Sequence, residues 1–163
     1  MISFILFYLI GVPISVLLHE MGNALGVVIF TREKSHIYLG PMNDDNKENF
    51  RIGRMHFHIK WDFSGFCAVN NRSDFTRFQN IVFLAGGPIA TFLLIIAAYL
   101  LGTSLLHDGI RNFLNGIFFA NLSLFLFTSF PMIYPNWLKP YAGRPSDGYQ
   151  ILTALKAKDE IKT

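Results

Sequence analysis

The sequence has few of the features that mark an ordinary soluble or secreted protein. It contains one cysteine, Cys67, so an internal disulfide is excluded, and we expect an unreactive thiol on a strand. Charged residues make up only 15% of the 163 residues, whereas 52% are hydrophobic, and the mean hydropathy is +0.36. This composition is too apolar for an ordinary soluble domain. Without an internal repeat, the chain is interpreted as a single domain over residues 1–163.

Three long hydrophobic stretches are present, over residues 2–30, 81–106 and 113–133. Each reaches the roughly 20 residues that cross the hydrocarbon core of a bilayer. The first lacks the basic segment and the small-residue cleavage site of a signal peptide, so we expect a retained helix, which Gly11 and Pro13 bend. The predicted fold is therefore an integral membrane α-helical protein with about three transmembrane helices.

Lysine and arginine are distributed very unevenly around these stretches. Eight lie in the 31–80 loop, five in the 134–163 loop and tail, and one, Arg111, in the short turn between the second and third stretches. Three spans put the loop and the tail on the same side, and an excess of positive charge marks the cytoplasmic side. We therefore predict a multi-pass protein of the cell membrane, and the net charge of +3 gives no reason to invoke nucleic acid.

The segment over residues 36–69 has the pattern of a small β-region. Apolar and polar residues alternate from Arg54 to Trp61, and the run Asn43-Asp44-Asp45-Asn46 is a turn signal. We expect two to four short strands at the membrane surface. His56 and His58 share one strand face, which either binds a metal or, as we favour, faces solvent or lipid headgroups.

Near the end of the first stretch, the run His19-Glu20-Met21-Gly22-Asn23 reads as the zinc-protease motif H-E-x-x-H with Asn in place of the last His. On a helix, residues 19 and 23 lie one turn apart on one face, where two side chains can bind one metal beside a Glu that acts as general base. An ionisable pair inside an apolar segment is costly and indicates a functional site.

Other polar and small residues interrupt the later stretches. Ala85-Gly86-Gly87-Pro88 opens the second, and its paired glycines allow close backbone contact. Asn121 lies among Phe and Leu in the third, where a buried amide needs a partner on a neighbouring helix or faces the site. Ser146-Asp147-Gly148 precedes a short amphipathic tail helix.

In this order, the motifs resemble those of the site-2 protease family of intramembrane zinc metalloproteases, in its small three-helix form. The resemblance covers almost the whole chain. His19 to Asn23 match H-E-x-x-H, residues 50–66 its membrane-associated β-region, and residues 85–90 the Gly-Pro start of its second core helix. Asn121 to Pro131, followed by Ser146-Asp147-Gly148, match its third helix and the Asp-Gly motif.

The resemblance implies a Zn²⁺ site in which His19 and Asp147 are ligands, Glu20 is the general base and Asn23 fills the third ligand position. Asn23 is the main departure, because an amide oxygen is a much weaker zinc donor than imidazole. Thr91 and Thr128 stand where the family often has Asn. Three outcomes stay open: Asn23 ligates weakly, another histidine (His36, His56 or His58) completes the site, or the site is inactive.

Two functions follow from these alternatives. The first is an intramembrane zinc endopeptidase that cuts in or near a transmembrane segment of a client protein, and the retained Glu20 favours it. The second is an inactive pseudoprotease that acts as a membrane adaptor and binds such clients, and Asn23 favours it. A transport or assembly subunit ranks last, since no inverted repeat is visible. The small, glycine-lined core could be completed by a membrane partner subunit.

Overall fold

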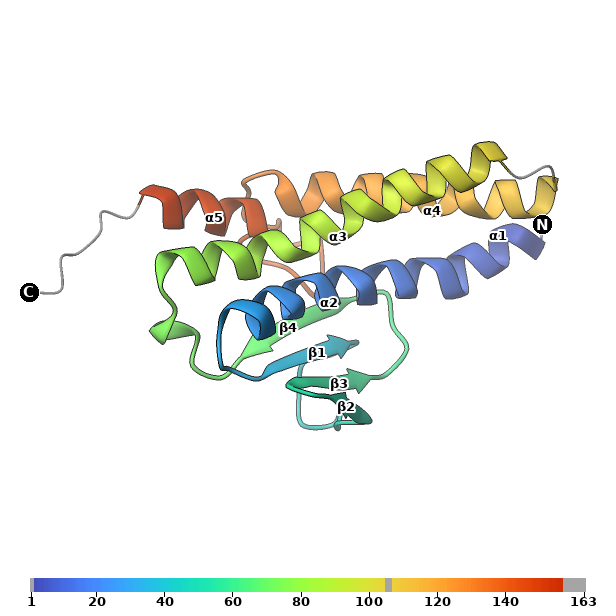
Figure 1. Cartoon of the computed structure of the whole chain (residues 1–163). Helices are drawn as coiled ribbons and strands as arrows, with labels where there is room; N and C mark the ends of the chain where they lie inside the picture. Colours follow the sequence, from blue (N-terminus) through green and yellow to red (C-terminus); the bar gives the residue numbers. More distant parts are fainter. Residues whose placement is uncertain (1, 105–106, 157–163) are drawn as a thin grey trace, which may run out of the picture.

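The computed structural model of the chain describes residues 2–104 and 107–156. It consists of three long helices, a short C-terminal helix and a small sheet (Figure 1). The helices are α1 (Ile2–Leu6), α2 (Val12–Phe30), α3 (Arg77–Ser104), α4 (Asp108–Ser129) and α5 (Asp147–Lys156). The strands are β1 (Ser35–Leu39), β2 (Phe50–Ile52), β3 (Met55–Ile59) and β4 (Gly65–Val69).

Three helical segments are long and apolar enough to cross a membrane: Ile2–Phe30, Arg77–Ser104 and Asp108–Ser129. The predicted stretches correspond to them, with shifted bounds. The second helix begins before residue 81, and residues 105–106 of its predicted end lie outside the described ranges. The third begins at Asp108, after His107 accepts a hydrogen bond from Gly109 N–H, and ends before Pro131, which cannot continue a helix.

The first long segment is not a uniform α-helix. A π-helical turn over Phe7–Gly11 joins α1 to α2 and ends two residues before Pro13. Proline lacks the N–H that would bond to the carbonyl four residues earlier, so the irregularity lies where Gly11 and Pro13 predicted a bend. The indole N–H of Trp61 donates to the Leu9 carbonyl at 2.9 Å, which ties the segment after β3 to this turn.

The sheet has the strand order β2-β3-β1-β4. Strand β1 pairs parallel with β3 and antiparallel with β4, while β2 and β3 form a hairpin around Gly53, whose φ of 58° favours glycine. Ile37 and Phe57 point from the sheet towards α2 and form a buried cluster with Ala24. The prediction of two to four strands over residues 36–69 is therefore confirmed, and the sheet is held against α2 by an apolar face.

Helices α2 and α3 cross at paired glycines. A Cβ at Gly22 would collide with the Gly86 carbonyl oxygen, and a Cβ at Gly86 would collide with the Gly22 carbonyl oxygen. This close approach brings α3 against the turn that carries His19 and Glu20. On the third long helix, Asn121 is fully buried and donates to Ser15 Oγ at 2.9 Å, so the predicted interhelical partner of this amide is a hydroxyl of α2.

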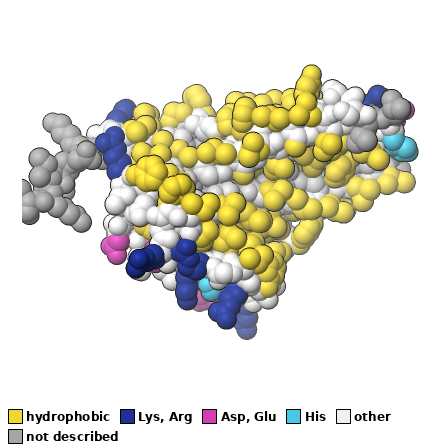
Figure 2. All heavy atoms as spheres, viewed as in Figure 1, with side chains coloured by type: hydrophobic (Ala, Val, Ile, Leu, Met, Phe, Trp, Pro, Cys, Tyr) yellow, Lys and Arg dark blue, Asp and Glu magenta, His cyan; other side chains and the backbone are white. Residues whose placement is uncertain are grey.

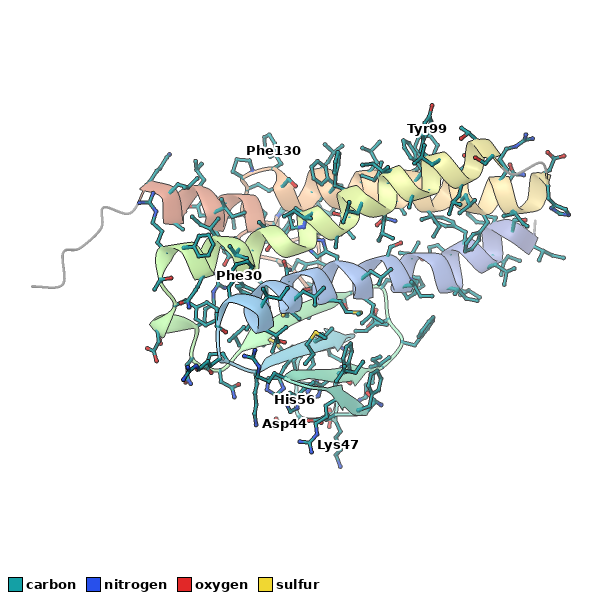
Figure 3. The ribbon with its side chains drawn as sticks, in the orientation of Figure 1. Phe30, Asp44, Lys47, His56, Tyr99 and Phe130 are labelled. Carbon is teal, nitrogen blue, oxygen red and sulfur yellow. The ribbon has the colours of Figure 1, made fainter. Side chains whose placement is uncertain are left out.

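Charged and apolar side chains lie on different parts of the surface. Figure 2 shows that Lys and Arg gather around the sheet and the neighbouring helix ends, whereas hydrophobic side chains cover most of the three long helices. Tyr99 and Phe130 point outwards from this apolar region (Figure 3), and both are more than half exposed. This separation matches the uneven distribution of positive charge in the sequence.

Candidate functional site

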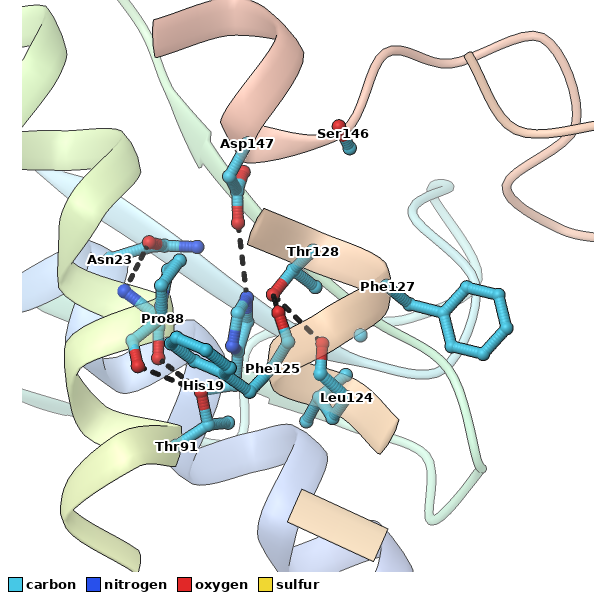
Figure 4. A network of polar contacts seen from close by, with 12 residues as sticks. His19, Asn23, Pro88, Thr91, Leu124, Phe125, Phe127, Thr128, Ser146 and Asp147 are labelled. Atoms are coloured by element: carbon cyan, nitrogen blue, oxygen red, sulfur yellow. Dashed lines mark hydrogen bonds and ion pairs between the residues drawn. The ribbon is translucent and has the colours of Figure 1, made fainter. Parts of the chain in front are cut away.

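A cavity of about 510 Å³ lies between α2, β4, the start of α5 and the segment before α5. It is lined by all four predicted site residues: His19, Glu20, Asn23 and Asp147. The first three lie on one turn of α2, and Asp147 begins α5, 124 positions after Asn23 in the chain. Folding therefore brings the two separate sequence motifs together on one wall (Figure 4).

His19 and Asp147 are in direct contact. His19 Nε2 lies 3.2 Å from Asp147 Oδ2. Adjacent ligand atoms of a tetrahedral zinc ion are about 3.3 Å apart when the bonds to the metal are about 2.0–2.1 Å. The observed separation therefore fits both a direct hydrogen bond and two ligands of one ion. His19 Nδ1 is buried without a hydrogen-bond partner among the described residues, whereas the Asp147 carboxylate is an acceptor for a proton on Nε2.

Asn23 lies against the glycine that precedes Pro88. Its Oδ1 accepts a hydrogen bond from Gly87 N–H at 2.6 Å. A Cβ at position 87 would lie 2.5 Å from His19 Nε2 and 2.8 Å from Asn23 Oδ1, so both side chains converge on the same point of α3. Only glycine leaves room for them there.

Glu20 lies beside the first residue of β4. A Cβ at Gly65 would be 2.9 Å from Glu20 Cγ and 3.3 Å from its Oε1, so the strand packs directly on this carboxyl group. The Glu20 carboxylate also interacts with the charges of His19 and Asp147 and faces the Asn23 amide. The predicted general base therefore shares one cavity with the three predicted ligands.

The donor atoms fit a metal ion only if Asn23 takes part. Among residues 2–104 and 107–156, no three His, Cys, Asp or Glu side chains are arranged to hold a metal ion. A site with three protein ligands here therefore requires the Asn23 amide oxygen. That oxygen has two lone pairs, of which Gly87 N–H uses one. The residues that could hold zinc are thus His19, Asn23 and Asp147, and the amide is the weakest donor of the three.

The three histidines that were alternative ligands do not reach this cavity. Strand alternation puts His36, His56 and His58 on the sheet face opposite Ile37 and Phe57, which face α2. The histidines contact one another instead: His36 Nδ1 lies 3.2 Å from His58 Nε2, and the rings of His36 and His56 stack at 4.9 Å. In Figure 3, His56, Asp44 and Lys47 all lie on the side of the sheet away from the helices.

The favoured prediction for this strand face, contact with solvent or headgroups, is wrong. His56 and His58 are only 6% and 9% exposed because residues 41–49 fold over them. Glu48 Oε2 lies 2.8 Å from His56 Nδ1, and the Asn46 carbonyl lies 2.9 Å from His58 Nδ1. The sequence shows the shared face of these histidines, but the position of the covering loop depends on the fold.

Cys67 lies on β4 and lines the cavity, partly buried, and it packs against both apolar clusters of the core. Burial raises the pKa of its thiol well above the ordinary value, which keeps the group protonated at neutral pH. A protonated thiol is a poor nucleophile, as predicted for this residue.

The two threonines at positions where the resemblance leads one to expect Asn bond only within their own helices. Thr91 Oγ1 donates to the carbonyls of Gly87 and Pro88, and Thr128 Oγ1 donates to those of Leu124 and Phe125 (Figure 4). Thr128 lines the cavity, whereas Thr91 is fully buried in the helix packing. Neither hydroxyl contacts His19 or Asp147 through a hydrogen bond in the described structure.

Sequence analysis did not identify three polar residues of the cavity: Arg72, Tyr134 and Tyr141. Arg72 donates to Asn80 Oδ1 at 3.0 Å and to Gln150 Oε1 at 2.7 Å, which links the start of α3 to α5. Burial raises the pKa of both tyrosines, so the phenols stay protonated. For the two tyrosines, the only sequence signal was a Pro- and Tyr-rich segment before Asp147, which does not show where its side chains lie.

Comparisons of the chain with protein-family models, with curated proteins and with solved structures gave no match. The chemistry of the cavity is therefore inferred from the residues that line it.

Proposed function

We propose that the chain is an intramembrane zinc metalloprotease of the site-2 type, which hydrolyses a peptide bond in or near a transmembrane segment of a client protein. One observation carries the proposal: His19, Glu20, Asn23 and Asp147 line a single cavity beside a strand edge. A general base, three oxygen or nitrogen donors and a surface that can bind an extended peptide are the parts that metal-assisted peptide hydrolysis requires.

In this proposal, the three long helices cross the cell membrane. Their length and composition support this, as does the apolar surface that covers them. The 31–80 loop and the tail face the cytoplasm, because they hold thirteen of the fourteen lysines and arginines. The cavity then opens near the cytoplasmic end of the helices, where a membrane-proximal client segment can enter.

Zinc is the metal proposed for the cavity, held by His19, Asn23 and Asp147. When bound, zinc lowers the pKa of a water molecule and polarises the peptide carbonyl. Asp147 also accepts a hydrogen bond from His19 in the absence of metal, so the pair is positioned before any ion arrives. This preorganisation offsets part of the affinity that the weak amide donor loses.

Glu20 is the proposed proton acceptor and donor. Its carboxylate lies on the same helical turn as His19 and lines the cavity from a fixed backbone position. It takes a proton from water as the water attacks the carbonyl carbon, and it transfers a proton to the leaving amine. Gly65 lies directly against the Glu20 side chain, where a Cβ would be only 2.9 Å from Glu20 Cγ.

Strand β4 is the proposed binding surface for the client. Its one strand partner among the described elements is β1, so its other edge is open towards the cavity. An extended client segment can add to this edge through backbone hydrogen bonds, which places one of its peptide bonds near Glu20.

The proposal is tested with a co-expressed membrane client and the full chain in detergent. We expect cleavage by the wild type, loss of cleavage in Glu20→Gln, and full cleavage in Glu33→Gln, a matched change outside the cavity. Zinc content is measured in parallel, and we expect about one ion per chain in the wild type and a large loss in Asp147→Ala. Cleavage that persists in Glu20→Gln would refute the proteolytic mechanism.

A second candidate function is a client-binding adaptor without catalysis. The hydrogen bond from Gly87 N–H to Asn23 Oδ1 favours it, because this bond satisfies the amide oxygen without a metal. The adaptor would bind clients at the edge of β4 equally well with a chelator present and in His19→Ala. Client binding that disappears with chelator would refute this alternative.

A further inference from the structure

The segment from Met132 to Ser146, between α4 and α5, forms a hairpin loop with its own hydrogen bonds. Ile133 and Pro145 pair as an antiparallel bridge at its base. Further up, Tyr134 N–H donates to the Arg144 carbonyl at 2.9 Å, and Gly143 N–H donates to the Tyr134 carbonyl at 2.9 Å. The hairpin loop therefore has backbone hydrogen bonds of its own.

The base of the hairpin loop is attached firmly beside Asp147. Ser146 is only 1% exposed, and its Oγ donates to the Phe130 carbonyl at 2.7 Å. The same oxygen accepts hydrogen bonds from Met132 N–H at 3.2 Å and Tyr149 N–H at 3.1 Å. Motion of the far end of the loop can therefore leave the position of Asp147 unchanged.

The open edge of β4 can be assigned from its pairing with β1. Gly40 N–H donates to the Ser64 carbonyl at 2.7 Å, so the backbone groups of Ser64 face β1. Because successive residues of a strand alternate in direction, the N–H and C=O of Gly65, Cys67 and Val69 face the other way. Among the described elements, no strand pairs with this edge.

The far end of the hairpin loop covers the beginning of this edge. Gly65 N–H donates to the Tyr141 hydroxyl oxygen at 2.8 Å. The Tyr141 ring lies 5.2 Å from the Phe66 ring, and the Arg144 guanidinium lies 4.5 Å from the centroid of the same ring. In the part of the chain that the structure describes, one polar contact and two contacts with the Phe66 ring thus join the loop to β4.

We propose that the hairpin loop is a flap over the client edge of β4, and that the hydrogen bond between Gly65 and Tyr141 is its latch. An extended client segment takes the Gly65 N–H in place of the Tyr141 hydroxyl, and the flap opens about its base at Ser146. The proposal rests on the proposed function for the identity of the client, but the latch is a property of the resting chain.

The latch is tested first by amide hydrogen exchange at Gly65, measured by NMR on the full chain in detergent. Tyr141→Phe removes one hydroxyl and keeps the ring, so we expect exchange at Gly65 to become about two- to tenfold faster. Tyr99→Phe is the matched control, because Tyr99 lies on α3, is 59% exposed and is outside both the cavity and the hairpin loop. Equal exchange rates at Gly65 in Tyr141→Phe and the wild type would overturn the proposal that this hydrogen bond is the latch.

Client access is tested with a fluorescein-labelled ten-residue peptide of alternating Val and Thr, which favours an extended conformation. We expect about two- to tenfold tighter binding to Tyr141→Phe, no change in Tyr99→Phe, and tighter binding in Arg144→Met, which removes the cation–π contact. The proposal that the hairpin loop is a flap would be overturned if the peptide bound both Tyr141→Phe and Arg144→Met no more tightly than the wild type. It would also be overturned if no variant bound the peptide.

These outcomes are separate from those that test the proposed function. Zinc content and Glu20-dependent cleavage decide whether the chain is a metalloprotease, whereas exchange at Gly65 decides whether the flap is latched. If the wild type cleaves a client and Tyr141→Phe lowers kcat at an unchanged KM, the hydroxyl takes part in chemistry and the latch is overturned.

Discussion

Asn23 and Gly87 are joined by a hydrogen bond of 2.6 Å from a backbone N–H of α3 to a side-chain oxygen of α2. The residue that departs from the zinc-protease motif is thus a structural link between two helices as well as a candidate ligand. An imidazole at position 23 would lack this link unless an unprotonated ring nitrogen took the place of the amide oxygen.

The first prediction concerns this position. We expect Asn23→His to bind zinc more than about tenfold more tightly than the wild type, since imidazole is a better zinc donor than an amide oxygen. Asn23→Ala should lose zinc and leave the Gly87 N–H unpaired, which costs about 1–3 kcal/mol of unfolding free energy. Competition with a zinc-sensitive dye measures the affinities, and equal affinities for Asn23→His and the wild type would contradict the assignment of position 23 as a ligand.

The second prediction concerns the contact of α2 with α3. A Cβ at Gly86 would collide with backbone atoms of Gly22, so we expect Gly86→Ala to lower the unfolding free energy by about 1–3 kcal/mol or more. Gly102 on the same helix is the matched control, because its nearest atoms would be 3.8 Å away. Gly102→Ala should be neutral or gain about 0.5–1 kcal/mol. Thermal unfolding in detergent compares the two variants, and equal melting temperatures for Gly86→Ala and Gly102→Ala would refute the close crossing of α2 and α3.

The third prediction concerns the pH dependence of stability. Burial, together with the charges of His56 and His58, lowers the pKa of His36 below its ordinary value of 6.5, against an opposing effect of Glu48. The His36 imidazole therefore binds a proton more readily in the unfolded chain than in the folded one. The neutral imidazole contributes stability above about pH 6.5, and this stability is lost as the pH falls through the lowered pKa. We expect melting temperatures to fall between pH 7 and pH 5 by less in His36→Gln than in the wild type. Melting temperatures that fall by the same amount in His36→Gln and the wild type would contradict this prediction.

The fourth prediction concerns the attachment of α5. Arg72 uses two nitrogens to bond Asn80 and Gln150, and Gln150 lies one turn after Asp147. We expect Arg72→Lys to lower zinc retention, because an ammonium group cannot reproduce the planar fork that holds α5. Arg32→Lys, at an exposed position, is the control. Unchanged zinc content in Arg72→Lys after dialysis would show that Asp147 is positioned without this link.

Much of the fold follows from local sequence patterns. Runs of about 20 apolar residues predict the three long helices, and the alternation around Met55 to Ile59 predicts a strand, because both patterns repeat within one element. The helix ends were less predictable, since α4 begins at Asp108 and includes the charged Asp108 and Arg111, before the apolar stretch. The candidate site was also visible: His19, Glu20 and Asn23 share one helical turn, and Asp147 follows a recognisable motif.

By itself, the sequence determined the helices, the strand-forming segment and the replacement of a histidine by Asn23, because these depend on composition and on spacing within one element. Only the tertiary structure decided what Asn23 bonds, where the histidines of the sheet lie and that Tyr141 caps Gly65. These contacts join residues that are far apart in the chain, and their geometry is set by how closely α2 and α3 cross and by which strand edge stays open.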